Sequence, residues 1–353
     1  MTFKIDRKFN ALAAAVIMTA GMATVAEAAK YEWTIQTSAQ AGDNFFPIEQ
    51  AWADRVGVMS NGEISINLVP VNSVVQYNET LEAVGAGILQ GHLTDPSYFS
   101  GKDPAFAMLG NLVGAWSHPS QMIKFMEYGG GNEVYNKLVN PYGLQFIGAA
   151  STGVEAFVSS KPIRSVADFK GIKMRAPEGM VQEVFAAVGA SPVNLPGSEV
   201  YTSLDKGVID AADYTVFSTN HAQGLHKFAK YPLYPGFHSM PTLAISLNKT
   251  IWDSLPANLQ EVMTVSVRDF SRDIVQQLEM MDNITSDVPP SMLFALVRSQ
   301  SAGSEPVSPS HASAVDPPAD MNSSCLRLLS SVPAYFNIAE ASPTPCPPAA
   351  WSL

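Results

Sequence analysis

The sequence has very little cysteine, and this limits how its fold is held together. Only Cys325 and Cys346 are present among 353 residues, so the preceding 324 residues have none. A bridge between these two stands as an alternative to free thiols, because spacing alone does not establish pairing. Most of the chain must therefore depend on its hydrophobic core rather than on disulfides.

Positive charge is also scarce. The chain has 21 Lys and Arg against 32 Asp and Glu, which gives a formal net charge of -11. This acidity argues against nucleic acid and anionic membrane surfaces as partners, and an anionic ligand would need a local positive group. Apolar residues make up 46% and charged residues 15%, which is enough apolar material for a core in one or two domains.

Motifs of the common enzyme classes are absent. The chain has no G-x-S-x-G, H-E-x-x-H, P-loop or G-x-G-x-x-G pattern. His221 and His226 are five residues apart. On a single helix they would be rotated by about 140° from each other, so we expect them not to share a face or form a zinc site.

Residues 1–28 have the pattern of a secretory signal peptide. Lys4, Arg7 and Lys8 precede a short apolar run, and Ala26-Glu27-Ala28 fits the small-x-small cleavage pattern. A membrane anchor is the alternative, but the apolar run is short for a bilayer. No later segment is long and apolar enough to be transmembrane, so we expect a soluble protein exported to the periplasm.

Strand and helix patterns alternate along both halves of the chain. In the first half, Glu63 to Val69 alternates through Ile64, Ile66 and Leu68, which predicts a strand. The second half repeats the order, with strands expected at 172–175, 192–195 and 208–213 and helices at 179–188 and after Ser198. Two such α/β units predict two lobes with a ligand cleft between them.

The end of the chain has a different character. Leu259 to Met281 predicts one long helix, but residues 284–353 contain 11 Pro, 14 Ser and no Lys. This composition is typical of a disordered, low-complexity segment. A genuine flexible extension and a frameshift are both open interpretations, and the second would make the product a broken copy.

Three residues form a candidate binding site. Arg175 lies at the C-terminal end of a predicted strand, where a guanidinium can clamp a carboxylate with two parallel hydrogen bonds; a surface arginine is the alternative. Asp213 ends the next strand and is a candidate ligand for a metal ion or a solute hydroxyl, or else a helix cap. Glu155 would pair with Arg175 or, together with Asp213, hold a cation. Oxygen ligands of this kind suit sodium or calcium.

Residues 163–213 contain three ordered segments: Asp168-Phe-Lys-Gly-Ile-Lys-Met-Arg-Ala-Pro, Val188-Gly-Ala-Ser-Pro-Val-Asn-Leu-Pro and Glu199-Val-Tyr-Thr-Ser-Leu-Asp-Lys-Gly-Val-Ile-Asp-Ala-Ala-Asp. In these segments the chain resembles the extracytoplasmic solute-binding proteins of TRAP transporters. Tyr128-Gly-Gly-Gly and Tyr234-Pro-Gly-Phe-His resemble the branch that binds 2-oxoacids and related hydroxyacids, often with a cation. The resemblance extends over about residues 30 to 283.

The resemblance implies an α/β, two-lobed periplasmic-binding-protein fold. This fold is type II-like, with a ligand cleft between the lobes and a long connecting helix. Lobe I is expected to comprise residues 29–150 and about 214–255. Lobe II is expected to comprise residues 151–213 and about 256–283.

The resemblance also implies roles for individual residues. Arg175 matches the carboxylate-binding arginine, and Glu155 falls where the 2-oxoacid branch has a glutamine touching ligand and cation. Asp213-Tyr214 falls where that branch has Glu-Trp, with the acid on the cation and the aromatic ring in the pocket. Ser239 falls where that branch has a glutamate near the cation. These departures imply a roomier pocket, a different acid, or no metal.

The expected sites follow from these matches. Phe217, Phe237 and His238 are candidates to support a larger or aromatic acid, with core packing as the alternative. The expected substrate-binding set is Glu155, Arg175, Tyr214, Phe217 and His238. The expected metal set is Asp213, Tyr214 and Ser239, with sodium or calcium bridging the ligand.

The function that the resemblance implies is solute capture without catalysis. The protein would be the periplasmic subunit of a TRAP transporter, taking up a 2-oxoacid, hydroxyacid or aromatic acid and delivering it to the membrane permease. The family's 2-oxoacid branch also implies a homodimer. A receptor for a signalling system and an α/β enzyme acting on a carboxylate stand as alternatives.

Overall fold

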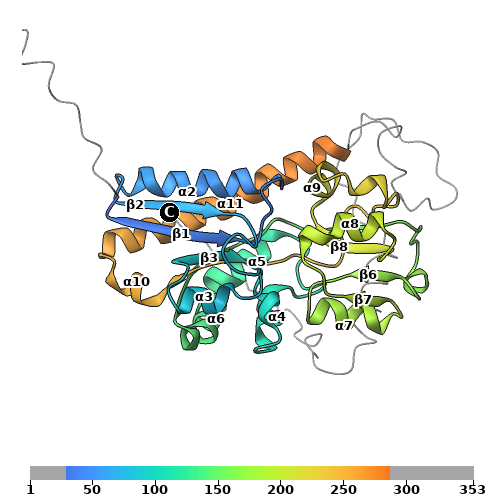
Figure 1. The fold of residues 1–353 in the computed structure, drawn as a ribbon, viewed down its shortest axis with the longest axis horizontal. Helices are drawn as coiled ribbons and strands as arrows, with labels where there is room; N and C mark the ends of the chain where they lie inside the picture. The colour runs from blue at the N-terminus through green and yellow to red at the C-terminus, as the bar shows by residue number, and fades with distance from the viewer. Residues whose placement is uncertain (1–28, 287–353) are drawn as a thin grey trace, which may run out of the picture.

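The computed structural model describes residues 29–286, which form two lobes built on two separate sheets (Figure 1). Lobe I contains a five-stranded sheet in the order β2-β1-β3-β9-β4, and lobe II contains a four-stranded sheet in the order β5-β8-β6-β7. The expected signal peptide, both cysteines and the Pro- and Ser-rich tail from 287 onward lie outside the described residues.

The sheet of lobe I is mixed. Strand β1 runs parallel to β2 and β3, whereas β9 runs antiparallel to β3 and β4. The alternation that predicted a strand in this lobe is visible in β2, where Ile64, Ile66 and Leu68 are buried and the residues between them are exposed. The bounds are β1 (Tyr31–Thr37), β2 (Ile64–Val69), β3 (Gly91–Thr94), β4 (Leu144–Ala150) and β9 (Leu243–Asn248).

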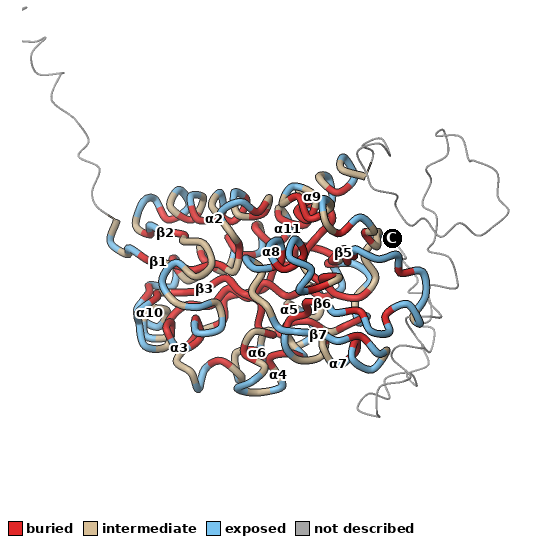
Figure 2. Tube along the Cα trace, turned by 45° about the vertical axis from the view of Figure 1, so that its right-hand side comes forward, coloured by how far each residue is buried: buried red, intermediate tan, exposed pale blue. Residues whose placement is uncertain are grey.

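Helices cover both faces of this sheet and so enclose two apolar cores (Figures 1 and 2). On one side lie α2 (Phe46–Met59) and α11 (Ala257–Ser286). The other side is covered by shorter helices, α3 (Thr80–Gly85), α4 (Ala105–Gly110), α5 (Pro119–Tyr128) and α6 (Gly131–Val139). The helix α10 (Lys249–Ser254) follows β9 directly.

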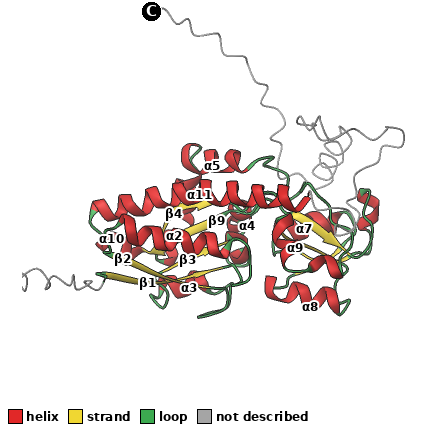
Figure 3. Cartoon of the chain, turned by 90° about the horizontal axis from the view of Figure 1, so that it is seen from above, coloured by secondary structure: helices red, strands yellow, loops and turns green. Residues whose placement is uncertain are grey.

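Lobe II is smaller, and its helices gather at the other end of the molecule (Figure 3). Strand β6 runs parallel to β7 and β8, and β5 runs antiparallel to β8. Ser165 and Asp168 form a capping box on a 3-10 turn that precedes β6. The bounds are β5 (Ala156–Ser159), β6 (Lys173–Arg175), β7 (Ser191–Val193), β8 (Ala211–Thr215), α7 (Met180–Ala187), α8 (Val200–Asp205) and α9 (Phe217–Ala222).

Helix α11 lies elsewhere than the expected division of the chain placed it. Residues 256–283 were assigned to lobe II, but α11 packs along β4 and α2 of lobe I and contacts α9 as well. Its stripe of buried apolar residues, which includes Phe270 and Ile274, completes the same core as Trp52. Conversely, α9 packs on β5 and β8, so the segment after Asp213 begins in lobe II. Among the described helices, neither α11 nor any other is long and apolar enough to cross a membrane.

The two histidines expected to point away from each other are in contact. Helix α9 ends at Ala222, and Gly224 has a φ of 76°, a left-handed conformation that reverses the chain. His226 then lies in a 3-10 turn, with its ring centroid 4.3 Å from that of His221 and nearly parallel to it. The prediction was wrong because it assumed one continuous helix.

Replacing Ile274 by Ala tests how far lobe I depends on α11. Ile274 is fully buried in the core between α11 and the sheet. We expect Ile274→Ala to lower the free energy of unfolding by about 2–5 kcal/mol, because the lost methyl groups leave a cavity. Val265→Ala on the same helix is the control, since Val265 is 39% exposed. Equal losses in the two variants, measured by urea unfolding, would contradict this packing.

Candidate functional site: a cleft between the lobes

A cavity of about 70 Å³ lies between the two lobes. Lobe I contributes residues from the loops that follow β1 and β3, among them Gln40 and Asp95, and lobe II contributes Arg175 and Tyr214. Loops at the carboxyl ends of strands are where α/β sheets bind their ligands. The volume is far below the roughly 300–1,000 Å³ of pockets for drug-sized ligands, so the cavity favours a small solute.

Arg175 lies at the end of β6 and faces this cavity, although its side chain is almost completely buried. Its Nε donates to the carbonyl of Leu195 at 3.0 Å, and Nη1 donates to the carbonyl of Asp213 at 2.6 Å. The guanidinium also lies over the ring of Tyr214, 5.7 Å from its centroid. These contacts fix the plane of the guanidinium at the cavity wall.

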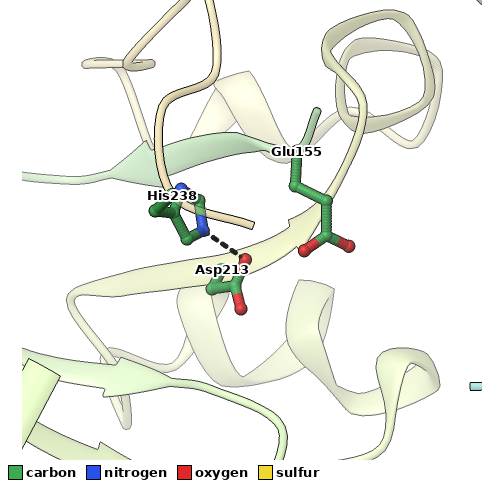
Figure 4. A group of neighbouring side chains, drawn as sticks. All are labelled: Glu155, Asp213 and His238. Atoms are coloured by element: carbon green, nitrogen blue, oxygen red, sulfur yellow. Dashed lines mark hydrogen bonds and ion pairs between the residues drawn. The ribbon is translucent and has the colours of Figure 1, made fainter. Parts of the chain in front are cut away.

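Glu155, Asp213 and His238 form a buried cluster beside the cavity (Figure 4), with one potential ligand atom from each residue lying within 4.8 Å of the others. His238 Nε2 donates to Asp213 Oδ1 at 2.6 Å. Asp213 Oδ2 is buried and has no hydrogen-bond partner among the described residues. The backbone N–H of Glu155 donates to the carbonyl of Ser239 at 2.9 Å, which ties the loop before β9 to the start of β5.

The pKa values of the two carboxyl groups of this cluster shift in opposite directions. Burial, followed by the negative charge of Asp213, raises the pKa of Glu155 well above its usual range. Burial acts in the same direction on Asp213, but His238, a hydrogen bond from Glu155 and the charge of Arg175 outweigh it and lower the pKa of Asp213. Asp213 is therefore the more readily ionised of the two carboxyl groups.

The cluster offers the donors that a bound cation needs. The unpartnered Asp213 Oδ2 and the carboxyl group of Glu155 supply oxygens of the kind that sodium and calcium prefer. The imidazole of His238 adds a nitrogen, a ligand more usual for transition metals. Ser239 lies beside this cluster, because its carbonyl accepts from the backbone N–H of Glu155, and its Oγ accepts a hydrogen bond from Asn111 Nδ2 at 2.5 Å. Of the expected metal set, Asp213 belongs to the cluster and Ser239 adjoins it.

The remaining expected residues separate into two groups. Tyr214 lines the cavity, whereas Phe217 and His238 are not among its lining residues. Phe217 stacks on Tyr234 with ring centroids 4.6 Å apart, which is core packing. His238 is 3% exposed and is enclosed by phenylalanine rings, including that of Phe237 at 4.9 Å. His238 therefore contacts Asp213 rather than facing the solute space.

Sequence reasoning missed most of the lobe I side of the cavity. Asp95 follows β3 at its carboxyl end, so the rule that pointed to Arg175 would also have found it. Asn111 follows the short helix α4 in an irregular segment, and no pattern in the sequence marks it. Tyr98 and Thr152 also line the cavity, and neither belongs to a recognisable motif.

Hydrogen bonds join the two lobes directly across the cleft. Gln40 Nε2 of lobe I donates to the hydroxyl of Tyr214 at 2.6 Å. Gln223 of lobe II donates both to Asp43 Oδ1 and, at 3.2 Å, to the same hydroxyl. We call Gln40, Asp43, Tyr214 and Gln223 the cross-cleft group. They stabilise the closed arrangement through contacts that need no bound solute.

The family model for the bacterial extracellular solute-binding proteins, family 7, matches residues 37–287. The chain belongs to this family. The chain is 31% identical over 252 residues to a monocarboxylate 2-oxoacid-binding periplasmic protein of Nostoc sp., covering 71% of this chain and 69% of that protein. The expected resemblance to solute-binding proteins of TRAP transporters is therefore confirmed.

Solved structures of TRAP periplasmic solute-binding proteins share this fold. One from Rhodobacter sphaeroides, in an apo open form, is 50% identical and has a TM-score of 0.60, covering 73% of this chain and 82% of that one. Another from Pseudoalteromonas atlantica, with bound sodium and pyruvate, is 29% identical and has a TM-score of 0.67, covering 74% and 79%. The predicted two-lobed fold is confirmed by these likenesses.

The pKa of Asp43 gives this site a measurable pH dependence. Burial raises it from 3.8 to about 6, and hydrogen bonds from Gln40 and Gln223 only partly offset the effect. Because the folded pKa exceeds the unfolded one, stability from this group is present at low pH and is lost as pH rises through about 6. Asp43→Asn should therefore gain about 2 kcal/mol relative to the parent between pH 4 and pH 7. A difference between the two proteins that stays constant with pH, in urea unfolding, would contradict this.

Proposed function

We propose that the protein is the solute-binding subunit of a TRAP transporter, which captures a small organic carboxylate in the cleft and delivers it to a membrane permease. The observation that carries this proposal is the buried guanidinium of Arg175 on the wall of a small cavity between two lobes. A carboxylate is the planar anion that a guanidinium binds best. The family and its relatives support the same conclusion.

The chemistry of the solute is supported by relatives. One binds monocarboxylate 2-oxoacids and another was solved with sodium and pyruvate. In this chain, Glu155, Asp213 and His238 would hold a sodium or calcium ion, which would supply positive charge beside the bound acid. A 2-oxoacid, a hydroxyacid or an aromatic acid remains within the proposed class.

Capture follows from closure of the lobes. In the open form the cleft admits the anion, and Arg175 in lobe II engages its carboxylate. Closure brings the loops of lobe I over the solute and removes water, which strengthens the charge interaction. The solute binds the closed form better and so shifts the population toward it. No bond of the solute is made or broken.

Export and assembly belong to the same proposal. Cleavage before Ala29 would release the chain into the periplasm, where the permease subunits are its partners. A homodimer is also proposed as its assembly. A receptor that feeds a signalling system would use the same cleft, and it would differ only in the partner that reads the closed form.

Substitution of Arg175 tests the proposed function most simply. Arg175→Lys keeps the charge but loses the planar fork, so we expect at least about tenfold weaker binding of L-lactate and of pyruvate. Arg175→Ala should abolish binding of both. Arg164→Ala is the control, because Arg164 is exposed and is not among the residues that line the cavity. Calorimetry should show unchanged affinity for the control. Unchanged affinity in Arg175→Lys and Arg175→Ala, both folded by circular dichroism, would sink the proposal.

The cross-cleft group allows a kinetic test of closure. Gln223→Ala removes the hydrogen bond to Asp43 that joins the two lobes, together with a hydrogen bond to Tyr214 within lobe II. We expect the solute to dissociate about tenfold faster, with little change in the association rate. Gln276→Ala on the exposed face of α11 is the matched control. A change confined to the association rate in stopped-flow measurements would contradict closure as the holding step.

A further inference from the structure

The lobe I wall of the cavity presents hydrogen-bond acceptors. Asp95 and Asn111 both line the cavity, and both are nearly inaccessible to bulk solvent. The lack of a side chain at Gly110 allows them to lie close together, because a Cβ on this residue would be only 2.7 Å from Asp95 Oδ1. Close approach of the backbone here therefore places the carboxylate of Asp95 beside the segment that carries Asn111.

The orientation of the Asn111 amide follows from its neighbours. Asn111 Nδ2 donates to Ser239 Oγ at 2.5 Å, so the amide presents its N–H group to Ser239. Its Oδ1 is left buried with no partner among the described residues.

Asp95 adds a second acceptor. Its Oδ1 accepts from the backbone N–H of Ser97 at 2.8 Å. Burial raises the pKa of Asp95 to about 6, so above pH 7 the carboxylate has no proton of its own to offer. Arg175 in lobe II is the charged donor that faces the same space, and its own fixed bonds go to backbone carbonyls.

We infer that the solute carries a hydrogen-bond donor, a hydroxyl or an ammonium group, on the carbon next to its carboxylate. This rests on the proposed function: Arg175 of lobe II binds the carboxylate, and Asp95 and Asn111 of lobe I accept from the neighbouring donor. A solute that spans both lobes in this way also explains why closure depends on it. Asp95 and Asn111 then determine specificity.

A 2-oxo group cannot make these contacts. Its oxygen has lone pairs but no proton, so it would displace water from Asn111 Oδ1 and Asp95 without replacing the lost hydrogen bonds. A site built to bind a donor rejects the analogue that lacks it, because buried acceptors are left unpaired. We expect a penalty of at least about tenfold in affinity.

Three acids with the same carbon skeleton test this directly. Pyruvate, lactate as each enantiomer and L-alanine differ only in the group beside the carboxylate. Isothermal titration calorimetry is run with the intact protein above pH 7, once with sodium and calcium and once with a chelator in sodium-free buffer. We expect lactate or alanine to bind at least tenfold tighter than pyruvate in both buffers, and the pair tells a hydroxyl from an ammonium group.

Substitution of Asp95 tests whether the preference for lactate or alanine over pyruvate depends on the lobe I wall of the cavity. Asp95→Asn replaces an acceptor by a group that can also donate, so the preference over pyruvate should fall several-fold. Asp205→Asn, at an exposed position on α8, is the matched control and should keep the preference of the parent. The parent protein alone suffices to decide the inference if Asp95→Asn does not fold.

The outcomes separate this inference from the proposed function. Pyruvate binding as tightly as lactate and alanine, or more tightly, in either buffer overturns the inference and leaves a carboxylate-binding protein. If none of the acids binds in either buffer, the inference falls, whereas the proposed function falls only if larger 2-oxoacids, hydroxyacids and aromatic acids also fail to bind. A preference for lactate or alanine that persists in Asp95→Asn would remove Asp95 from the account.

Discussion

The guanidinium of Arg175 is a full charge with almost no contact with water, and much of the cleft is arranged around that constraint. A buried cation is tolerated only where hydrogen-bond acceptors surround it. Here the backbone carbonyls of Leu195 and Asp213 accept hydrogen bonds from the guanidinium. The sheet order of lobe II makes this possible, because β6 lies directly beside β8. Arg175 thus ends one strand and binds the backbone of its neighbour. The N–H groups of the guanidinium that face the cavity are therefore available to bind an anion.

Lobe closure depends on two kinds of contact that act together. The solute links Arg175 of lobe II to acceptors of lobe I, and the cross-cleft group joins the lobes through direct hydrogen bonds. Helix α11 packs on lobe I and also reaches α9 of lobe II, so it connects the lobes behind the cleft. A cleft held in this way has an open and a closed arrangement, and a solute selects between them by its contacts with both walls.

The sequence predicted the helices and strands that have strong local patterns. It also predicted Arg175 as a site residue, from the rule that ligands bind at the carboxyl ends of strands. Alternating Ile64, Ile66 and Leu68 gave β2, and the position of Arg175 at a strand end placed it at the cleft. The lobe that α11 covers could not be predicted, because an amphipathic helix fits any apolar face of the right size.

Predictions failed where a turn, or a segment far away in the sequence, determines which side chains are in contact. The turn at Gly224 brings His221 onto His226 against a helical expectation. Phe217 packs in the core because its neighbour in space is Tyr234, 17 residues further along the chain. Asn111 was missed because its role comes from Ser239, 128 residues away.

A crystal structure with bound lactate tests the account most directly. The account predicts the carboxylate of lactate on Arg175 and its hydroxyl on the wall formed by Asp95 and Asn111. A lactate bound away from Arg175 would contradict it.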